Sequence, residues 1–350
     1  MNTPGGRDDA ARTSTSGAIL EPVDDAVSSE SLADSDLRRA AGHWNKPRDL
    51  GRTRWWTSPQ VHRHINRLVC GEAIEGPWGG FHRCLGELAP RGGFRRAISV
   101  AAGHGGKELD LIECGIVQHF DLFEISEARV ESGRNNARAR GLDDRISYRL
   151  ADAFAEDLPD NYDLVYWNNA IHHMMDTPAA VRWSRERLRM GGVFAMDDFV
   201  GSQRFQWPDH HLTMMSRVRE QLPDRYLVNP RDPSKTLPRK VNRPNEAALI
   251  EQDPTEAADS ERILPAVRQY FPGVRITLTG GVIYHSGLND VLANFDDDGL
   301  DVEILAQVLL VDEALARAGD TQYAVALARK RPILSNVARA KRRLRKLMHR

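Results

Sequence analysis

The sequence predicts an α/β fold: a Rossmann-like, doubly wound, mostly parallel sheet with an N-terminal helical segment and a cap insertion. Three observations support this prediction. Short apolar runs alternate with helical stretches from residue 95 onward, as in the crossover units of parallel sheets. A glycine-rich turn, Gly103-His104-Gly105-Gly106, follows the first apolar run. The alternation then stops over 201–258, and a connection this long inside a domain is usually functional, so we expect it to form a cap.

The elements follow in order. Ser58 can cap a helix that begins at Pro59, which places a helix in the segment 41–94. We expect strands at 97–101, 119–124, 146–150, 162–167, 193–196, 274–278 and 322–328, and helices at 128–140, 177–190, 260–271 and 302–318. The whole sheet domain should span 95–330. Residues 1–40 are acidic and poor in apolar side chains, so we predict a disordered arm there.

Charge is distributed unevenly along the chain. The formal net charge is −1, but residues 329–350 contain ten Lys/Arg and no Asp/Glu, which leaves 38 basic and 49 acidic residues in 1–328. The tail 331–350 has apolar residues on one helix face. A basic amphipathic helix of this kind can lie on an anionic membrane or dock on the acidic body, and nucleic acid is a third, weaker candidate. The body offers no basic groove, so we expect no nucleic-acid substrate.

Several protein classes are excluded by the composition. No apolar run is long enough to span a bilayer, and the N-terminus lacks the apolar core of a signal peptide. The three cysteines, Cys70, Cys84 and Cys114, are widely spaced and do not form a CxxC pair, which favours a reducing compartment. We therefore predict a cytoplasmic protein, with peripheral contact at the inner membrane face through 333–350 as one role for the tail.

Polar residues or glycines end four consecutive predicted strands. Gly103 and Gly105 would let a ligand approach the backbone, and Glu124 could accept ribose hydroxyls. Asp152 could accept an adenine amino hydrogen, and Asn168 ends the fourth strand beside the same crevice. Each has an ordinary alternative, such as a surface carboxylate or a helix N-cap. Four such features together favour a nucleoside-containing ligand at this edge.

Five segments resemble the motifs of class I S-adenosylmethionine-dependent methyltransferases: AISVAAGHGGKELDL, DLFEIS, YRLADAF, YDLVYWNNAIHHMMD and LRMGGVFAMDDF. The resemblance covers 97–200 and, more loosely, 260–330. Three further segments, WWTSP, DPTEAADSERILPAVRQYF and GGVIYHSGLNDVLANF, resemble bacterial methyltransferases of glycan or secondary-metabolite pathways.

This resemblance implies S-adenosyl-L-methionine as cofactor. The implied cofactor-binding residues are Ala101, Gly103, Gly105, Glu124, Ile125, Asp152, Ala153 and Asn168. The chain departs from the family where Ser99 replaces an acidic residue and Ala101 replaces a glycine, which weakens the contact expected to the cofactor's amino group. The Asn-Asn-Ala sequence after strand four also differs from the motif of enzymes that methylate nucleic-acid amino groups.

Methyl transfer to a hydroxyl needs a base. His173 is our first candidate because its motif would lie beside the cofactor's methyl group. Further acceptor-side candidates are His172, Asp198, Trp207 and His285. The residues Asp197, Asp198, Asp209, His210 and His211 have donor atoms suited to a metal, but no spacing among them is diagnostic, so no metal is predicted.

The leading hypothesis is therefore a methyltransferase that acts on a small-molecule or glycan acceptor, at oxygen. An oxidoreductase with a nucleotide cofactor is the second hypothesis, although the GxGxxG signature is absent. A non-catalytic binding protein on a degenerate methyltransferase fold is the third, because of Ser99 and Ala101.

Overall fold

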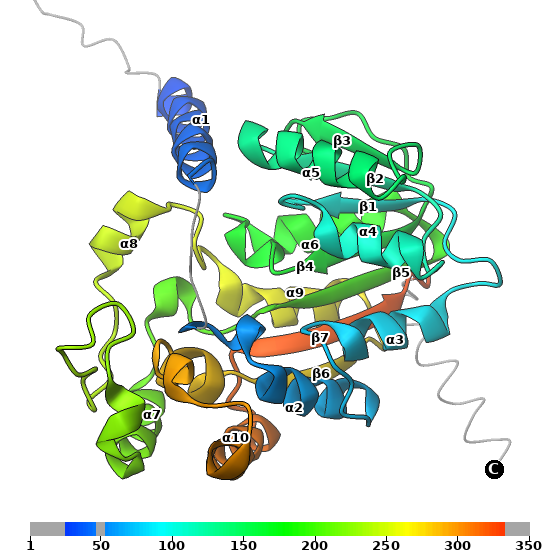
Figure 1. Ribbon diagram of the computed structural model, residues 1–350. Helices are drawn as coiled ribbons and strands as arrows, with labels where there is room; N and C mark the ends of the chain where they lie inside the picture. Colours follow the sequence, from blue (N-terminus) through cyan, green and yellow to red (C-terminus); the bar gives the residue numbers. More distant parts are fainter. Residues whose placement is uncertain (1–24, 47–52, 333–350) are drawn as a thin grey trace, which may run out of the picture. The chain divides into compact units, whose positions relative to one another are not determined.

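The computed structural model describes residues 25–46 and 53–332, and their side chains from Ser35 onward (Figure 1). Contacts divide the chain into two units, residues 1–35 and 36–350, and the second contains the sheet. Among the residues described, no helix combines the length and the apolarity that crossing a bilayer requires. Residues 333–350 of the basic tail lie outside the described residues, as do residues 1–24 of the N-terminal arm.

The described chain forms a seven-stranded sheet in the order β3-β2-β1-β4-β5-β7-β6. The strands are β1 (Ala97–Val100), β2 (Phe120–Glu124), β3 (Ile146–Leu150), β4 (Tyr162–Asn168), β5 (Leu188–Phe199), β6 (Arg275–Gly280) and β7 (Tyr323–Arg329). Strands β1 to β5 are parallel, and β7 is antiparallel to both β5 and β6. The predicted doubly wound, mostly parallel fold is confirmed. The strand order reverses between β1 and β4, and ligands of such sheets bind at this reversal, beyond the carboxyl ends of the strands.

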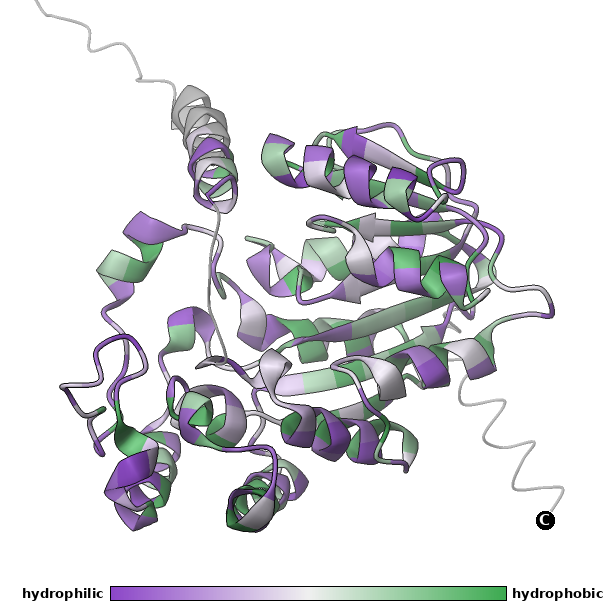
Figure 2. Cartoon of the chain, viewed as in Figure 1, coloured by the Kyte–Doolittle hydropathy of each residue, from purple (hydrophilic) through white to green (hydrophobic). Residues whose placement is uncertain are grey.

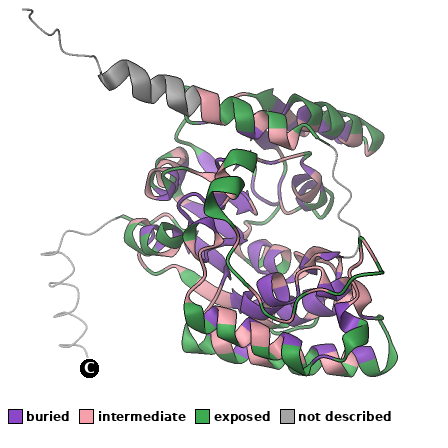
Figure 3. Cartoon of the chain, turned by 90° about the vertical axis from the view of Figure 1, so that its left-hand side faces the viewer, coloured by how far each residue is buried: buried purple, intermediate pink, exposed green. Residues whose placement is uncertain are grey.

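Helices cover both faces of the sheet (Figure 1). One face packs against α2 (Pro59–Cys70), α3 (Gly79–Leu88), α4 (Gly106–Glu113), α5 (Glu127–Ala139) and α10 (Gly299–Ala318), and the other packs against α6 (Thr177–Arg187) and α9 (Ile263–Tyr270). The alternation is visible in β4, where Leu164 and Tyr166 belong to one apolar cluster and Val165 and Trp167 to the other. Figure 2 shows the central strands as mainly hydrophobic, and Figure 3 shows that burial is concentrated there.

Helix α2 forms as its sequence predicts. Ser58 is the N-cap, its hydroxyl accepts from the Val61 amide, and Pro59 occupies the first helical position. The adjacent Trp55 is 3% exposed and packs edge-on against Tyr284 and Tyr323, so its role is packing.

The prediction of disorder over 1–40 is wrong for residues 25–40, which belong to α1 (Asp25–Trp44). The arm is acidic and polar on average, but its C-terminal end has apolar residues on one helix face. Leu37, Ala40 and Trp44 recur at helical spacing, and Ala40 is buried.

The insertion 201–258 contains α7 (Asp209–Gln221) and α8 (Glu246–Gln252). Helix α7 contacts the π-helix η7 (Val282–Gly287). The buried Arg219 of α7 donates to the carbonyls of Gly287, Pro238 and Asn289. The insertion is therefore fastened to the C-terminal part of the domain through backbone carbonyls.

Candidate active site

The turn after β1 has two glycines with different roles. Ala101, Gly103 and Gly105 all have positive φ angles, of 51°, 61° and 70°. A Cβ atom on Gly105 would lie 2.5 Å from the Tyr148 hydroxyl, so this glycine is required by packing. A Cβ atom on Gly103 would meet nothing nearer than the Arg129 guanidinium at 3.5 Å. The open side at Gly103 is therefore the place where a ligand can approach the backbone.

Glu124, at the end of β2, is held by three backbone amides. Its Oε2 accepts from Gly103 N at 2.8 Å, and its Oε1 accepts from the amides of Ile125 and Ser126, each at 2.9 Å. A carboxylate offers about four acceptor positions. Glu124 therefore has about one acceptor position left for a ligand hydroxyl. The sequence had suggested that it could accept both ribose hydroxyls, so the expected number of contacts falls from two to one. Ile125 takes part through its amide.

Asn168, at the end of β4, is bound by a lysine that the motif analysis missed. Lys107 Nζ donates to the Asn168 carbonyl at 2.5 Å and to Asn168 Oδ1 at 3.1 Å. Burial lowers the pKa of Lys107, against the raising effect of nearby Glu108, Asp198 and Asp197. The sequence did contain a sign of this role, because Lys107 directly follows the turn AAGHGG. The amine of Lys107 thus lies at the end of β4, beside the reversal of strand order.

The family resemblance leads one to expect a carboxylate at position 99, where this chain has Ser99. A carboxylate is nevertheless close by, because Glu108 of α4 contacts Ser99. Ser99 Oγ donates to Glu108 Oε1 at 2.7 Å, and Glu108 is 2% exposed. Burial raises the pKa of Glu108. The chain thus places a serine–glutamate pair behind the turn.

Asp152 and Ala153 follow β3. Asp152 Oδ1 accepts from the Phe154 amide at 2.9 Å, which closes a local turn. Ala153 is fully buried. Asp152 thus stabilises the backbone of its own turn, much as the ordinary alternative of a helix N-cap suggested. A contact of Asp152 to adenine stays a prediction.

His172 and Asp198 form a buried pair at the ends of β4 and β5. His172 Nδ1 lies 2.5 Å from Asp198 Oδ1. The other oxygen, Asp198 Oδ2, accepts from the amides of Ala170 at 2.7 Å and Ile171 at 3.0 Å. Asp198 can only accept when ionised, so the proton of a neutral His172 ring is held on Nδ1 and the lone pair is on Nε2.

His173 is oriented by the end of the insertion. Its Nδ1 lies 3.1 Å from Thr255 Oγ1, and the Thr255 hydroxyl donates to Asp253 Oδ1 at 2.6 Å. Because Thr255 gives its only proton to Asp253, its oxygen accepts from His173 Nδ1. The Trp44 ring meets His173 edge-on, with the centroids 5.3 Å apart. Two neighbouring imidazoles thus carry their proton on Nδ1, each fixed by an oxygen acceptor.

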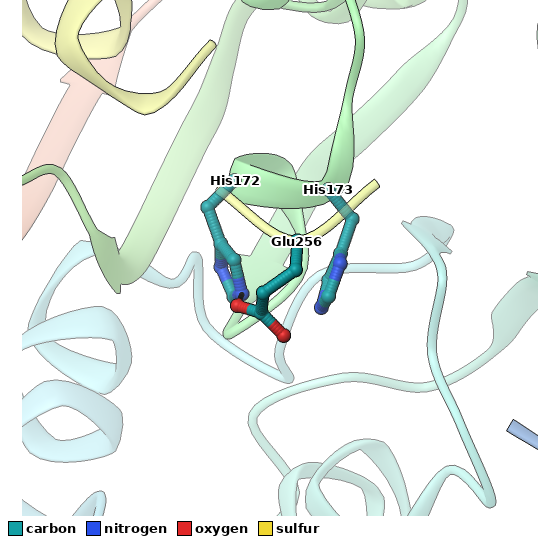
Figure 4. A group of neighbouring side chains, drawn as sticks. All are labelled: His172, His173 and Glu256. Atoms are coloured by element: carbon teal, nitrogen blue, oxygen red, sulfur yellow. Dashed lines mark ion pairs between the residues drawn. The ribbon is translucent and has the colours of Figure 1, made fainter. Parts of the chain in front are cut away.

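The two rings and Glu256 form a compact group (Figure 4). The ring centroids of His172 and His173 are 4.1 Å apart, and Glu256 Oε1 lies 3.6 Å from His172 Nε2. Figure 4 shows the Glu256 carboxylate beside both rings, at their lower ends. One ligand-type atom from each residue lies within 4.8 Å of the others, so the group can share a proton or hold a cation.

The electrostatics of this edge are dominated by acids. Burial acts to lower the pKa of His172, but Asp198, followed by Glu256 and Asp253, outweighs it and the pKa is raised. Burial, then the charge of Asp198, raise the pKa of Asp197 to about 7. The edge is therefore suited to a positively charged ligand and stabilises the protonated form of His172.

His285 and Trp207 belong to an aromatic cluster around Phe199. Phe199 lies 6.0 Å from the His172 ring, 5.7 Å from His285 and 5.1 Å from Phe205, which stacks on Trp207 at 6.0 Å. Burial, with Arg54 and His172 nearby, lowers the pKa of His285 to about 3. His285 is therefore a neutral side chain of this cluster, which makes it unsuited to act as a base near neutral pH.

Sequence reasoning thus identified the strand-end residues of the first four strands and missed their distant partners. The missed residues are Trp44, Lys107, Asp253, Thr255 and Glu256. The Arg129 guanidinium lies over the Trp44 ring, 4.1 Å from its centroid.

Comparison with known proteins gives one family and several relatives. Residues 95–241 match the sequence model of a family described as a methyltransferase domain. The chain is 35% identical over 79 residues to 27-O-demethylrifamycin SV methyltransferase of Amycolatopsis mediterranei (strain S699), a match that covers 22% of this chain and 29% of that protein. Methyltransferase GfsG of Streptomyces halstedii matches equally, over 22% of this chain and 28% of its own. The matched stretch spans less than a third of either relative.

Solved structures are similar at low identity. A geranyl diphosphate C-methyltransferase from Streptomyces coelicolor A3(2), in complex with Mg²⁺, geranyl diphosphate and S-adenosyl-L-homocysteine, has a TM-score of 0.49 and 12% identity, covering 84% of this chain and 97% of that one. The [4+2]-cyclase SpnF has a TM-score of 0.42 and 18% identity, covering 78% and 94%.

Proposed function

We propose that this chain, which carries a methyltransferase domain, transfers a methyl group from S-adenosylmethionine to a hydroxyl oxygen of a small-molecule acceptor. The observation that carries the proposal is the buried His172–Asp198 pair at the carboxyl ends of β4 and β5. It lies at the sheet edge that also carries the open glycine turn and Glu124.

The described residues fit the cofactor. The backbone at Gly103 is open to a ligand, and Glu124 can accept about one ribose hydroxyl. The buried carboxylate of Asp198 suits the positive charge of a sulfonium. Lys107, whose amine lies at the end of β4, suits the cofactor's carboxylate. We further assign contacts to Ala101, Gly105, Ile125, Asp152, Ala153 and Asn168. When bound, S-adenosylmethionine supplies a methyl group on a good leaving group, so the protein has mainly to position the acceptor and remove its proton.

His172 is the base that the geometry favours, ahead of His173, which the sequence ranked first. Asp198 orients the ring of His172 and stabilises the imidazolium that forms when Nε2 takes the acceptor proton. His173 and Glu256 lie beside it and can hold the acceptor hydroxyl in place. Asp198 is then a positioning residue.

The acceptor class follows from the relatives and from the aromatic cluster. 27-O-demethylrifamycin SV methyltransferase is named for a complex small molecule that lacks one O-methyl group. The aromatic cluster of Phe199, Phe205, Trp207 and His285 lies next to His172 and would suit an apolar body bearing a hydroxyl. A glycan remains the second acceptor class for the test below.

Titration calorimetry tests the cofactor. S-adenosylmethionine and S-adenosylhomocysteine should bind, whereas NAD and NADP should not. Glu124→Ala should weaken cofactor binding by about 10-fold, because a charged hydrogen bond to ribose contributes about 1.5–3 kcal/mol. Binding of NAD or NADP alone would favour the oxidoreductase hypothesis, and binding of none would favour a non-catalytic protein.

Transfer of a labelled methyl group to panels of polyketide-type alcohols and of glycans tests the acceptor. Label recovered as an alkali-stable ether supports oxygen transfer. Label on carbon or nitrogen would contradict it.

We also propose that the tail attaches the chain to anionic membranes, since residues 329–350 carry ten positive and no negative side chains. Anionic liposomes at low salt should retain the full chain better than a 1–328 truncation. Equal retention would remove this proposal.

A further inference from the structure

We propose that His210, His211 and Asp320 form a second site, for a divalent transition metal such as Zn²⁺, which fastens the cap insertion to the sheet. The histidines open α7, and Asp320 lies between α10 and β7. The site is separate from the His172 group and its role is structural.

The distances among the three side chains are those of metal ligands. Asp320 Oδ1 lies 3.0 Å from His210 Nε2 and 3.3 Å from His211 Nε2. One donor atom from each residue lies within 4.8 Å of the other two. Zn²⁺ binds nitrogen and oxygen at roughly 2.0–2.2 Å, which puts neighbouring ligands of a tetrahedral site about 3.3 Å apart. Both distances to the carboxylate oxygen are close to those that a bound ion imposes, and without an ion the 3.0 Å contact of His210 is a direct hydrogen bond.

The hydrogen bonds of the described residues leave Nδ1 of the buried His211 ring without a partner. Its side chain is buried, with the residue only 6% exposed. Among the described residues, Nδ1 of His211 has no hydrogen-bond partner, and Nε2 has Asp320 Oδ1 at 3.3 Å as a polar neighbour. An ion between the rings and Asp320 would give the buried Nε2 a partner closer than the carboxylate oxygen.

The donor set and the exposure favour a transition metal with an open position. Two imidazole nitrogens and one carboxylate suit Zn²⁺, whereas Mg²⁺ and Ca²⁺ prefer oxygen ligands throughout. The His210 side chain is 57% exposed, so solvent can supply a fourth ligand and a route of entry.

The acid that faces the two histidines is Asp320, although Asp209 is closer to them in sequence. Asp209, directly before the histidines, is paired with Arg243. Asp320 is 110 residues away from His210 in sequence, which explains why no motif spacing showed the site. An ion here would link the first turn of α7, two residues after Pro208, to the segment that leads into β7.

Metal titration of the chelator-stripped full chain tests the proposal, with Co²⁺ as a spectroscopic probe and Zn²⁺ by calorimetry. We expect one ion to bind tightly enough to survive gel filtration, with visible d–d absorption from Co²⁺ and a raised thermal midpoint in Zn²⁺. The exposed variant His210→Ala and the variant Asp320→Asn should each lower metal affinity by at least about 10-fold.

The matched control is the double variant His172→Ala/Glu256→Gln, which disables the other histidine group. It should keep the Co²⁺ spectrum and the Zn²⁺ affinity. Loss of binding in this control but not in His210→Ala would move the metal to the sheet edge and overturn the proposal. Absence of any binding to the native chain would also overturn it. Circular dichroism of each variant separates loss of a ligand from loss of the fold.

Discussion

The chain contains two pairs of adjacent histidines, and comparing them shows how surroundings decide chemistry. His172-His173 is built into the sheet edge, and each Nδ1 is fixed by an oxygen, from Asp198 or Thr255. His210-His211 opens a helix of the cap and shares a single oxygen of Asp320. The first pair is prepared to move a proton, because its tautomers are set. In the second pair, Nδ1 of His211 has no hydrogen-bond partner among the described residues, and the Nε2 atoms of both rings face the same oxygen of Asp320, as ligands of one ion would.

The largest expected effect is on the rate of methyl transfer, which should depend on the His172-His173 pair and not on the His210-His211 pair. His172→Ala should lower the rate of methyl transfer by about 10²–10⁴-fold, the usual contribution of a positioned base. His210→Ala should stay within about twofold of the native rate. Measuring initial rates at saturating S-adenosylmethionine decides this, and equal losses in both variants would contradict the division of roles.

A smaller effect concerns pH. The pKa of His172 is raised above its ordinary 6.5, so kcat/KM should fall as the pH drops through a value above 6.5, where the base becomes protonated. Asp198→Asn removes the charge that raises this pKa, so the acid limb should move to lower pH while the maximal rate falls. A limb that stays in place would show that His172 is not the base. Rescue of the limb by Asp198→Glu would identify the carboxylate charge as the cause.

The smallest effect is on stability and contrasts Asp197 with Asp320. The pKa of Asp197 is about 7 in the fold, against an ordinary value of 3.8, so the fold favours its protonated form. This contribution to stability is full below about pH 4 and is lost as the pH rises through about 7. Asp197→Asn should therefore match the native chain near pH 4 and exceed it near pH 8 by on the order of 4 kcal/mol. Urea unfolding across this range measures it, with metal-free Asp320→Asn as the surface control that should show no such gain.

The sequence predicted the sheet well because its signals are local. Apolar runs, helix caps and glycines act over a few residues, so the strand positions and the polar residues at their ends followed from spacing alone. The disorder expected over 1–40 does not hold for residues 25–40, which are helical, because that expectation was based on composition and not on a local pattern. Average composition describes a long segment, whereas burial of Ala40 depends on what the helix packs against.

The sequence by itself determined the fold class, the glycine turn and the polar strand ends at Glu124, Asp152 and Asn168, since parallel strands bring their carboxyl ends to one edge. The tertiary structure decided which groups meet there. It brought Thr255 to His173 across 82 residues and Asp320 to His210 across 110. It also decided that burial keeps His285 neutral, whereas Asp198 and the neighbouring acids raise the pKa of His172 against the effect of burial. Proton positions and metal geometry depend on distances of a few ångströms between segments far apart in the chain, and no local pattern encodes those distances.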